Sequence, residues 1–255
     1  MADGLIEAVH DPSASGGSGL VHLPDTGTSL VFRSTAGGRA DLLVVGPRTR
    51  AAYFTGKELP VCVGVRLRPG VARAVLGAPV SDLVDRVVPL AEFWGADASR
   101  LERRLTDLGD RDLIAARIER ALRARVAERG LGGEIRLVHA AARELTSARP
   151  ARVPDLARRL AVSERHLRGL FTEGAGLPPK AFARIARLRA ALARNRTAAP
   201  EDAGQPTGPG AGGLAELAAV SGYYDQAHMS AEFRSMLGVP PGAFFAGRLP
   251  APATC

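Results

Sequence analysis

Two arginines with hydrogen-bonding potential follow a capping serine in the stretch 153–171, VPDLARRLAVSERHLRGLF. Arg165 and Arg168 lie off the apolar face of the helix predicted there, and an arginine can make paired hydrogen bonds to guanine. Ser163 is a good N-cap for that helix, and its hydroxyl or the free amides beside it can hold a phosphate. Glu164 can accept a hydrogen bond from cytosine N4 or remain a solvated first-turn carboxylate. These residue types indicate contacts to nucleic acid.

The same stretch predicts two short helices with a tight break between them. Leu156, Ala157 and Leu160 stand at i, i+1 and i+4 and form one apolar face. After the break at 161–162, a second helix has its own apolar face, formed by Leu167, Leu170 and Phe171. This pattern is typical of a helix-turn-helix, whose second helix enters the DNA major groove. A second copy occupies 214–234, and two such units favour DNA binding far more than one.

Positive charge gathers on the first unit and on the helix predicted after it. The chain carries a net charge of +8, and residues 151–196 hold eleven basic and three acidic residues. Residues 197–255 hold two basic and five acidic residues. A charge run is often only a solvated face, but this one coincides with a helix-turn-helix pattern and suits a phosphate backbone. We therefore include Lys180 and Arg184, at the start of the predicted helix, among the DNA contacts.

Length and composition place the chain among globular proteins. It has 255 residues, enough for two domains with separate cores, and 46% of them are apolar. No apolar run approaches the roughly 18 residues of a membrane span, and the N-terminus lacks the layout of a signal peptide. The two cysteines, Cys62 and Cys255, form no disulfide framework and fit a reducing compartment. We expect a cytoplasmic protein with no membrane partner.

The first part of the chain predicts a β-rich domain with trailing helices. Residues 1–19 are rich in Gly, Ser and Asp and predict a flexible arm. From residue 20 to about 67, the apolar runs SLVF, DLLVV and PVCVGVRL are separated by Gly and Pro and predict strands. Helices are then expected at 71–76, 91–108, 112–129 and 134–145. The third of these would present one broad apolar face formed by Leu113, Ala116, Ile118, Ala121, Leu122 and Val126.

A junction at 146–150 leads to an all-α part, so the predicted fold class is α+β. The N-terminal regulatory or sensor domain is assigned to 20–130 and the DNA-binding domain to 134–250. In the second domain, a strong helix over 180–194 joins the two helix-turn-helix units. The Pro/Gly-rich segment 195–213 cannot pack a core and predicts a loop.

Two blocks of residues carry a family signature. The first comprises Ser163, Leu167, Phe171, Gly176, Pro179 and Phe182. The second comprises Gly222-Tyr223, Asp225-Gln226, His228, Phe233-Arg234, Gly238-Val239-Pro240 and Phe244. Over about residues 134–246 the chain thereby resembles the AraC/XylS family of bacterial transcription regulators.

This resemblance implies two helix-turn-helix units, joined by one long helix, that read successive major-groove segments of double-stranded DNA. In the second recognition helix Gln226 can pair with adenine. Ala227, Ser230 and Ala231 match groove-facing positions but are small. Arg234 alone supplies positive charge in this unit, so we expect specificity to lie mostly in the first unit.

Three other features of the second unit have structural interpretations. Asp225 is expected to cap the recognition helix, Tyr223 to lie in the core, and His228 to be a structural histidine with satisfied hydrogen bonds.

The loop over 195–213 is longer than the usual connection in the family. It can bulge into solvent, or it can relax the spacing of the two half-sites.

Motifs in the front half are similar to an N-terminal domain of unknown function found in a subset of these regulators and distantly cupin-like. These motifs are 64–70 (GVRLRPG), 88–90 (VPL) and 93–95 (FWG). Arg66, Arg68 and Trp94 can line a pocket for a small-molecule effector. Alternatively, Trp94 is simple core, and Arg68 caps the following helix or pairs with Asp82 or Asp85.

Signatures of an enzyme are missing from the sequence. There is no Gly-x-Ser-x-Gly, P-loop or dinucleotide motif, and Asp82, Asp85 and Arg86 suit a surface helix better than an acid/base set. No close metal-ligand spacing is formed by the histidines, which are His10, His22, His139, His166 and His228. We expect no catalytic activity, metal or cofactor.

Other classes of function stay open. The chain can be a small-molecule-binding module whose DNA affinity is weak or effector-dependent, or a regulator that answers to a protein partner or has lost sensing. RNA polymerase and a second copy of the chain are further candidate partners, although no coiled-coil heptad is visible.

Overall fold

Three apolar runs form the centre of the N-terminal half as β3 (Ser29–Ser34), β4 (Ala40–Val45) and β6 (Val61–Leu67), which confirms the predicted strands. The structure is a computed structural model and describes residues 5–11, 19–35, 37–55, 59–129, 132–147, 150–197 and 213–253. With β1 (Ile6–His10) and β7 (Val87–Pro89), the three strands form an open antiparallel sheet in the order β1-β6-β3-β4-β7.

Strand β1 overturns part of the prediction of a flexible arm over 1–19. It pairs antiparallel with β6, so that Ile6 lies opposite Leu67 and His10 opposite Gly64. The strand forms because β6 would otherwise leave a row of backbone groups unpaired at this edge. The Gly- and Ser-rich residues around it hid this from the sequence. Residues 1–4 and 12–18 of the predicted arm lie outside the described residues.

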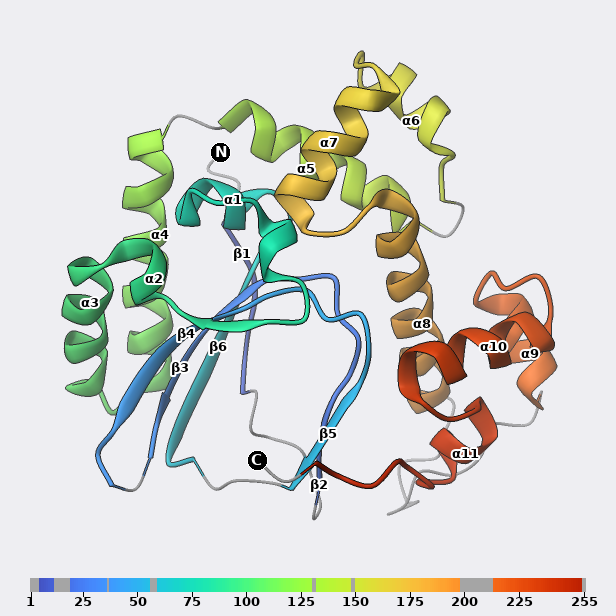
Figure 1. Ribbon diagram of the computed structural model, residues 1–255, viewed down its shortest axis with the longest axis horizontal. Helices are drawn as coiled ribbons and strands as arrows, with labels where there is room; N and C mark the ends of the chain where they lie inside the picture. Colours follow the sequence, from blue (N-terminus) through green and yellow to red (C-terminus); the bar gives the residue numbers. More distant parts are fainter. Residues whose placement is uncertain are drawn as a thin grey trace.

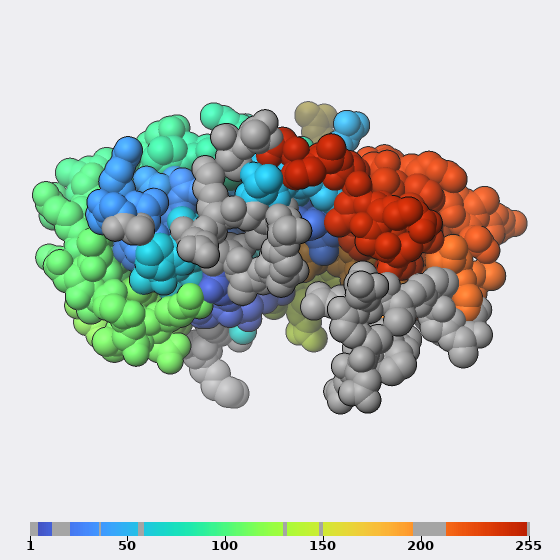
Figure 2. Space-filling view, turned by 90° about the horizontal axis from the view of Figure 1, so that it is seen from below, coloured from blue at the N-terminus to red at the C-terminus, as the bar shows by residue number. Residues whose placement is uncertain are grey.

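A separate small sheet joins the front of the chain to its end. β2 (Gly19–His22) pairs antiparallel with β5 (Ala52–Thr55). Phe54 of β5 also forms an isolated parallel bridge with Ala253, near the C-terminus. Figure 2 shows the C-terminal residues, in red, lying against residues of the N-terminal half in cyan.

Helices cover the large sheet at one side (Figure 1). They are α1 (Val71–Leu76), a 3-10 turn η1 (Val80–Leu83), α2 (Ala91–Trp94), α3 (Ala96–Thr106) and α4 (Arg111–Arg129). The predicted single helix over 91–108 is broken at Gly95, whose φ of 52° lies in the left-handed region. α3 packs on β4 and α4 on β6, and their buried faces complete the core of this half.

The predicted core face of α4 is wrong in two positions. Leu113 is 57% exposed and Ala116 is also exposed. The buried stripe instead runs through Ile114, Ile118 and Leu122, which are four residues apart and lie above one another on the helix. The predicted arc was too broad because this helix carries apolar residues on more than one side.

The C-terminal half consists of helices around a second hydrophobic cluster. They are α5 (Gly132–Leu145), α6 (Val153–Arg159), α7 (Glu164–Ala175), α8 (Pro179–Thr197), α9 (Gly213–Val220), α10 (Gln226–Leu237) and α11 (Pro241–Phe245). The predicted loop over 195–213 starts too early, since α8 continues to Thr197, and residues 198–212 lie outside the described residues.

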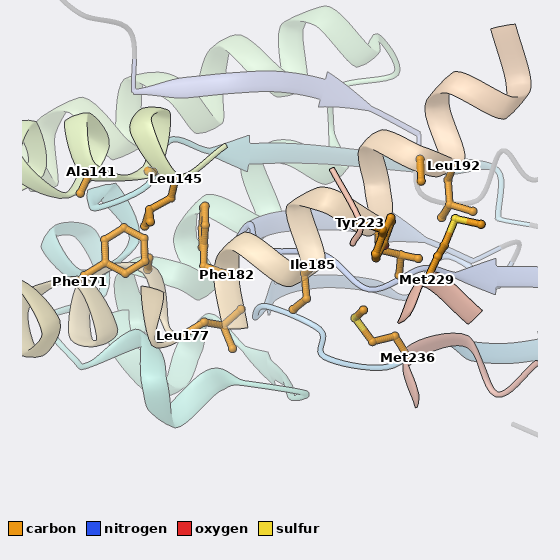
Figure 3. Packing of buried hydrophobic residues seen from close by; sticks show 14 of the residues in the cluster. Ala141, Leu145, Phe171, Leu177, Phe182, Ile185, Leu192, Tyr223, Met229 and Met236 are labelled. Carbon is orange, nitrogen blue, oxygen red and sulfur yellow. The ribbon is translucent and has the colours of Figure 1, made fainter. Parts of the chain in front are cut away.

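Helix α8 is the axis of this half (Figure 1). Its apolar residues include Phe182, Ile185 and Leu192, which Figure 3 shows in one layer with residues of α5, α7 and α10. One end of α8 packs near the helix pair α6–α7, and its other end lies beside the pair α9–α10. Below, these are called the first and the second helix pair.

Candidate nucleic-acid interface

The first helix pair turns between Leu160 and Ser163. Ala161 has a φ of 54°, in the left-handed region that residues with a side chain rarely adopt. The amide of Val162 donates to the carbonyl of Ala157 at 3.1 Å and closes the end of α6. Leu156 is 1% exposed and Phe171 is completely buried, so the two helices pack through the predicted faces.

The start of α7 has the predicted cap and a free polar face. The Ser163 hydroxyl accepts a hydrogen bond from the His166 amide at 3.1 Å, which confirms the N-cap. Glu164, Arg165 and Arg168 are all exposed. Arg168 contacts Glu164 one turn away at 3.4 Å. Such an exposed pair contributes only about 0.3–0.5 kcal/mol, so Arg168 can exchange it for another acceptor at little cost.

The opposite end of α7 is held by the N-terminal half. Arg73 forms an ion pair with Glu173 at 3.1 Å. The amide of Gly70 donates to the carbonyl of Gly174 at 3.3 Å. Gly176 ends the helix with a φ of 84°, tightly against residues of the N-terminal half. The N-terminal half therefore covers the end of α7 that is distant from Ser163.

Helix α8 carries the two basic residues predicted to contact DNA, in different surroundings. Lys180 is exposed in the first turn. Arg184 instead donates through Nε to Oε1 of Glu232 at 2.5 Å, and Glu232 is only 6% exposed. The pair joins α8 to α10, so Arg184 has a partner within the protein that the sequence did not indicate.

The second helix pair repeats the local design of the first. Gly222 turns the chain with a φ of 75°, and the Asp225 carboxylate accepts from the His228 amide at 2.7 Å, which confirms the predicted cap. Tyr223 is 5% exposed and lies in the core, also as predicted. Exposed positions of α10 are occupied by Gln226, Ala227, Ala231 and Arg234, and Ser230 is half-buried.

Glu232 is buried at the contact between α8 and α10, among polar and aromatic side chains. His228 approaches its Oε1 at 3.7 Å through Nε2, while Oε2 has no hydrogen-bond partner. The Tyr223 ring meets the His228 ring edge-on at 5.5 Å, and Arg187 lies 5.4 Å above the Tyr223 ring. Burial, with the Glu232 carboxylate adding to it, raises the pKa of Tyr223. His228 thus contacts residues of its own unit, while its side chain is 41% exposed.

The second pair, too, is held by the N-terminal half at the end of its second helix. The Ala51 amide donates to the Met236 carbonyl at 2.7 Å. The Tyr53 hydroxyl donates to the Leu237 carbonyl at 2.6 Å. Both α7 and α10 are therefore anchored near their C-terminal ends, and their capped N-terminal ends stay accessible.

The three residues predicted to line an effector pocket have separate surroundings. Arg66 pairs with Glu7 at 2.8 Å and with Asp25 at 2.6 Å. Trp94 is 7% exposed and donates through Nε1 to the Val75 carbonyl at 2.9 Å, so the core interpretation holds for it. The described partners of Arg66 and Trp94 have no residue in common.

The alternative partners of Arg68, which are Asp82 and Asp85, bind other residues. Asp85 binds the amide and hydroxyl of Thr49 at 2.7 and 2.5 Å. The Asp82 carboxylate receives a bond from the neighbouring Ser81 hydroxyl at 3.4 Å. Arg68 itself is half-buried just before α1, and its amide donates to the Leu5 carbonyl at 3.0 Å.

The described residues contain neither a candidate metal site nor a candidate membrane-spanning helix. No group of three or more His, Cys, Asp or Glu side chains there is arranged to hold a metal ion. No described helix has both the length and the apolar character needed to cross a bilayer. Cys62 is buried, and Cys255 lies outside the described residues.

Comparison with known proteins gives one family match and distant structural neighbours. A family model described as "Domain of unknown function (DUF6597)" matches residues 14–89, and no curated protein matches the chain. A ToxT structure from Vibrio cholerae is 10% identical, with a TM-score of 0.43 over 92% of this chain and 100% of that one. Another, from strain O395, is 10% identical, with a TM-score of 0.41 over 93% and 91% of the two chains.

Proposed function

We propose that the chain is a sequence-specific DNA-binding transcription regulator of the AraC/XylS type, acting in the cytoplasm without catalytic activity. Helices α7 and α10 would enter successive major-groove segments, with α8 as the spacer between them. The N-terminal half would regulate or sense. A second copy of the chain and RNA polymerase are the protein partners to test for.

The strongest support is the accessible, capped start of α7. Ser163, Glu164, Arg165 and Arg168 are exposed there, and the N-terminal half contacts the far end of the helix through Gly70. The surrounding residues 151–196 have eleven basic and three acidic side chains. Arginine forks and free amides at a helix start are what guanine edges and phosphates bind.

The first helix pair should dominate specificity. Exposed positions of α10 hold alanines and one glutamine as potential base readers, and Arg234 is the exposed cation of that helix. Long polar side chains make bidentate contacts to bases, whereas alanine can at most touch a thymine methyl. The first pair offers two arginines and a glutamate at the corresponding end of its second helix.

The deciding experiment is selection of genomic DNA fragments by the purified protein, followed by a salt series on the best fragment. We expect a recurrent motif and a steep loss of affinity with salt. Arg168→Ala should weaken binding to the motif about tenfold or more, and more than Gln226→Ala does. A larger loss with Gln226→Ala would reverse the assignment of the dominant unit, and no binding at low salt would overturn the proposed function.

A further inference from the structure

A cavity of about 390 Å³ lies where β2 of the N-terminal half meets α8 and α11. Its walls come from β2, α8 and α11 and from the residues next to them. It is lined by Val21, Leu23, Arg189, Leu192, Ala193, Asn195, Phe244, Phe245, Gly247 and Leu249. Binding sites for small molecules usually have about 300–1,000 Å³, so the cavity is large enough for one.

The lining is apolar with one cation. The phenylalanines, leucines and valine give apolar walls, and Arg189 is the charged residue among the lining side chains. Asn195, a further polar residue of the wall, is 9% exposed. Such a surface matches a molecule whose body is apolar and which carries a single negative group.

Arg189 keeps donors for such a group, because its contacts with the protein are long. Its Nη1 lies 3.4 Å from the Pro24 carbonyl and 3.7 Å from the Asp25 carboxylate, and its side chain is 44% exposed. Asp25 has a closer partner in Arg66, at 2.6 Å. A guanidinium has five N–H donors, so it can bind a carboxylate or sulfonate without leaving Asp25 uncompensated.

The position of the cavity ties it to the second helix pair. Phe244 and Phe245 of α11 pack on Phe233 in α10, with ring centroids 6.4 and 5.7 Å apart. Arg189 belongs to α8, the axis between the two pairs. A molecule in the cavity would therefore touch the N-terminal half, the axis α8, and α11, which packs on the core of the second pair.

We propose that this cavity is the binding site of a small apolar molecule with one acidic group, which Arg189 binds, and that its occupancy alters DNA binding through α8 and α11. The binding part stands on the cavity alone, whereas the effect on DNA rests on the proposed function.

Two fluorescent probes test the binding part. 8-Anilinonaphthalene-1-sulfonate is an apolar anion, and N-phenyl-1-naphthylamine is its uncharged counterpart. We expect saturable binding of one sulfonate probe per folded chain. Ala193 is exposed on α8 and lines the cavity, so Ala193→Phe adds bulk there without disturbing the core, and should weaken both probes tenfold or more. Ala124→Phe, at an exposed position of α4, is the matched control and should change neither.

The acidic group is tested with Arg189→Met, which keeps most of the stem of the side chain and removes its charge. We expect a loss of about tenfold or more for the sulfonate probe and less than about twofold for the uncharged probe. Equal losses would overturn the role of Arg189. The proposed site would be refuted if Ala193→Phe left the binding of the sulfonate probe unchanged. It would also be refuted if the unmodified protein did not bind this probe.

The effect on DNA is measured separately, as the affinity for the selected fragment with and without saturating sulfonate probe. We expect a change of at least about fivefold, since coupling between two sites is usually of this size or larger. An unchanged affinity with intact probe binding would refute the coupling. Failure of the protein to bind any DNA, with the probe still bound, would instead refute the proposed function.

Discussion

Arg184 can have either of two roles. It positions α10 through its ion pair with Glu232, or it contacts DNA. Removing one partner of a fully buried ion pair destabilises a protein by roughly 3–5 kcal/mol, because the other charge stays buried. Glu232 is 6% exposed, while the Arg184 side chain is 40% exposed. Water can partly reach the arginine side of the pair, so we expect Arg184→Met to lower the free energy of unfolding by about 2 kcal/mol.

The matching variant removes the buried charge instead. Glu232→Gln keeps an oxygen that can accept from Arg184, and we expect a loss of about 1 kcal/mol. The double variant leaves neither charge unpaired. Its free energy of unfolding should therefore be about 1–2 kcal/mol higher than the value expected if the two single losses added. Chemical denaturation of the four proteins gives this coupling energy without any DNA.

DNA binding distinguishes the two roles of Arg184. If it positions α10, Arg184→Met and Glu232→Gln both lower affinity, and the salt dependence stays unchanged. If it binds a phosphate, Arg184→Met lowers the slope of log K against log salt by about 0.9, and Glu232→Gln raises affinity by removing a negative charge. Lys180→Met, at an exposed position on the same helix, is the control with the phosphate signature. A zero coupling energy together with a reduced slope for Arg184→Met would refute the positioning role.

Three further predictions concern stability. Ser163→Ala removes the acceptor of the His166 amide and should lower the free energy of unfolding by about 0.5–2 kcal/mol, measured by denaturation. Tyr53→Phe removes the hydrogen bond to the Leu237 carbonyl and should lower the free energy of unfolding by about 0.5–1.5 kcal/mol, also measured by denaturation. As a control, the circular dichroism spectrum of this variant should equal that of the wild type. Burial, with a nearby arginine adding to it, lowers the pKa of His22 from 6.5 to about 4, so the unfolded chain binds the extra proton first. The contribution of His22 to stability is then complete above pH 6.5 and is lost as the pH falls towards 4. Over this interval, the melting temperature of His22→Gln should fall less than that of the wild type.

Local features of the fold could be predicted from the sequence because neighbouring residues cause them. The caps at Ser163 and Asp225 depend on an amide three residues away, so the pattern of types suffices. The strands β3, β4 and β6 are runs of β-branched and other apolar residues between turn residues. Strand β1 was not predicted, because its partner β6 lies more than fifty residues away in the chain.

The surroundings of charged residues could not be predicted in the same way. Arg66 was expected to line an effector pocket and Arg184 to contact DNA, but each has a carboxylate partner far away in the chain, Asp25 and Glu232 respectively. Only the fold brings these carboxylates to them. The basic residues of α8 therefore include Arg184, which has a partner in the protein, and Lys180, which is exposed, and a count of charges does not separate the two kinds.

The spacing of the two helix pairs does not depend on the long segment between α8 and α9 alone. α8 packs against both pairs, and the N-terminal half binds the end of α7 through Gly70 and the end of α10 through Ala51 and Tyr53. Each pair thus has an anchor besides the chain connection, and both anchors lie at the ends away from the capped helix starts. In the proposed complex with DNA, we therefore expect a fixed spacing of the two half-sites rather than a relaxed one.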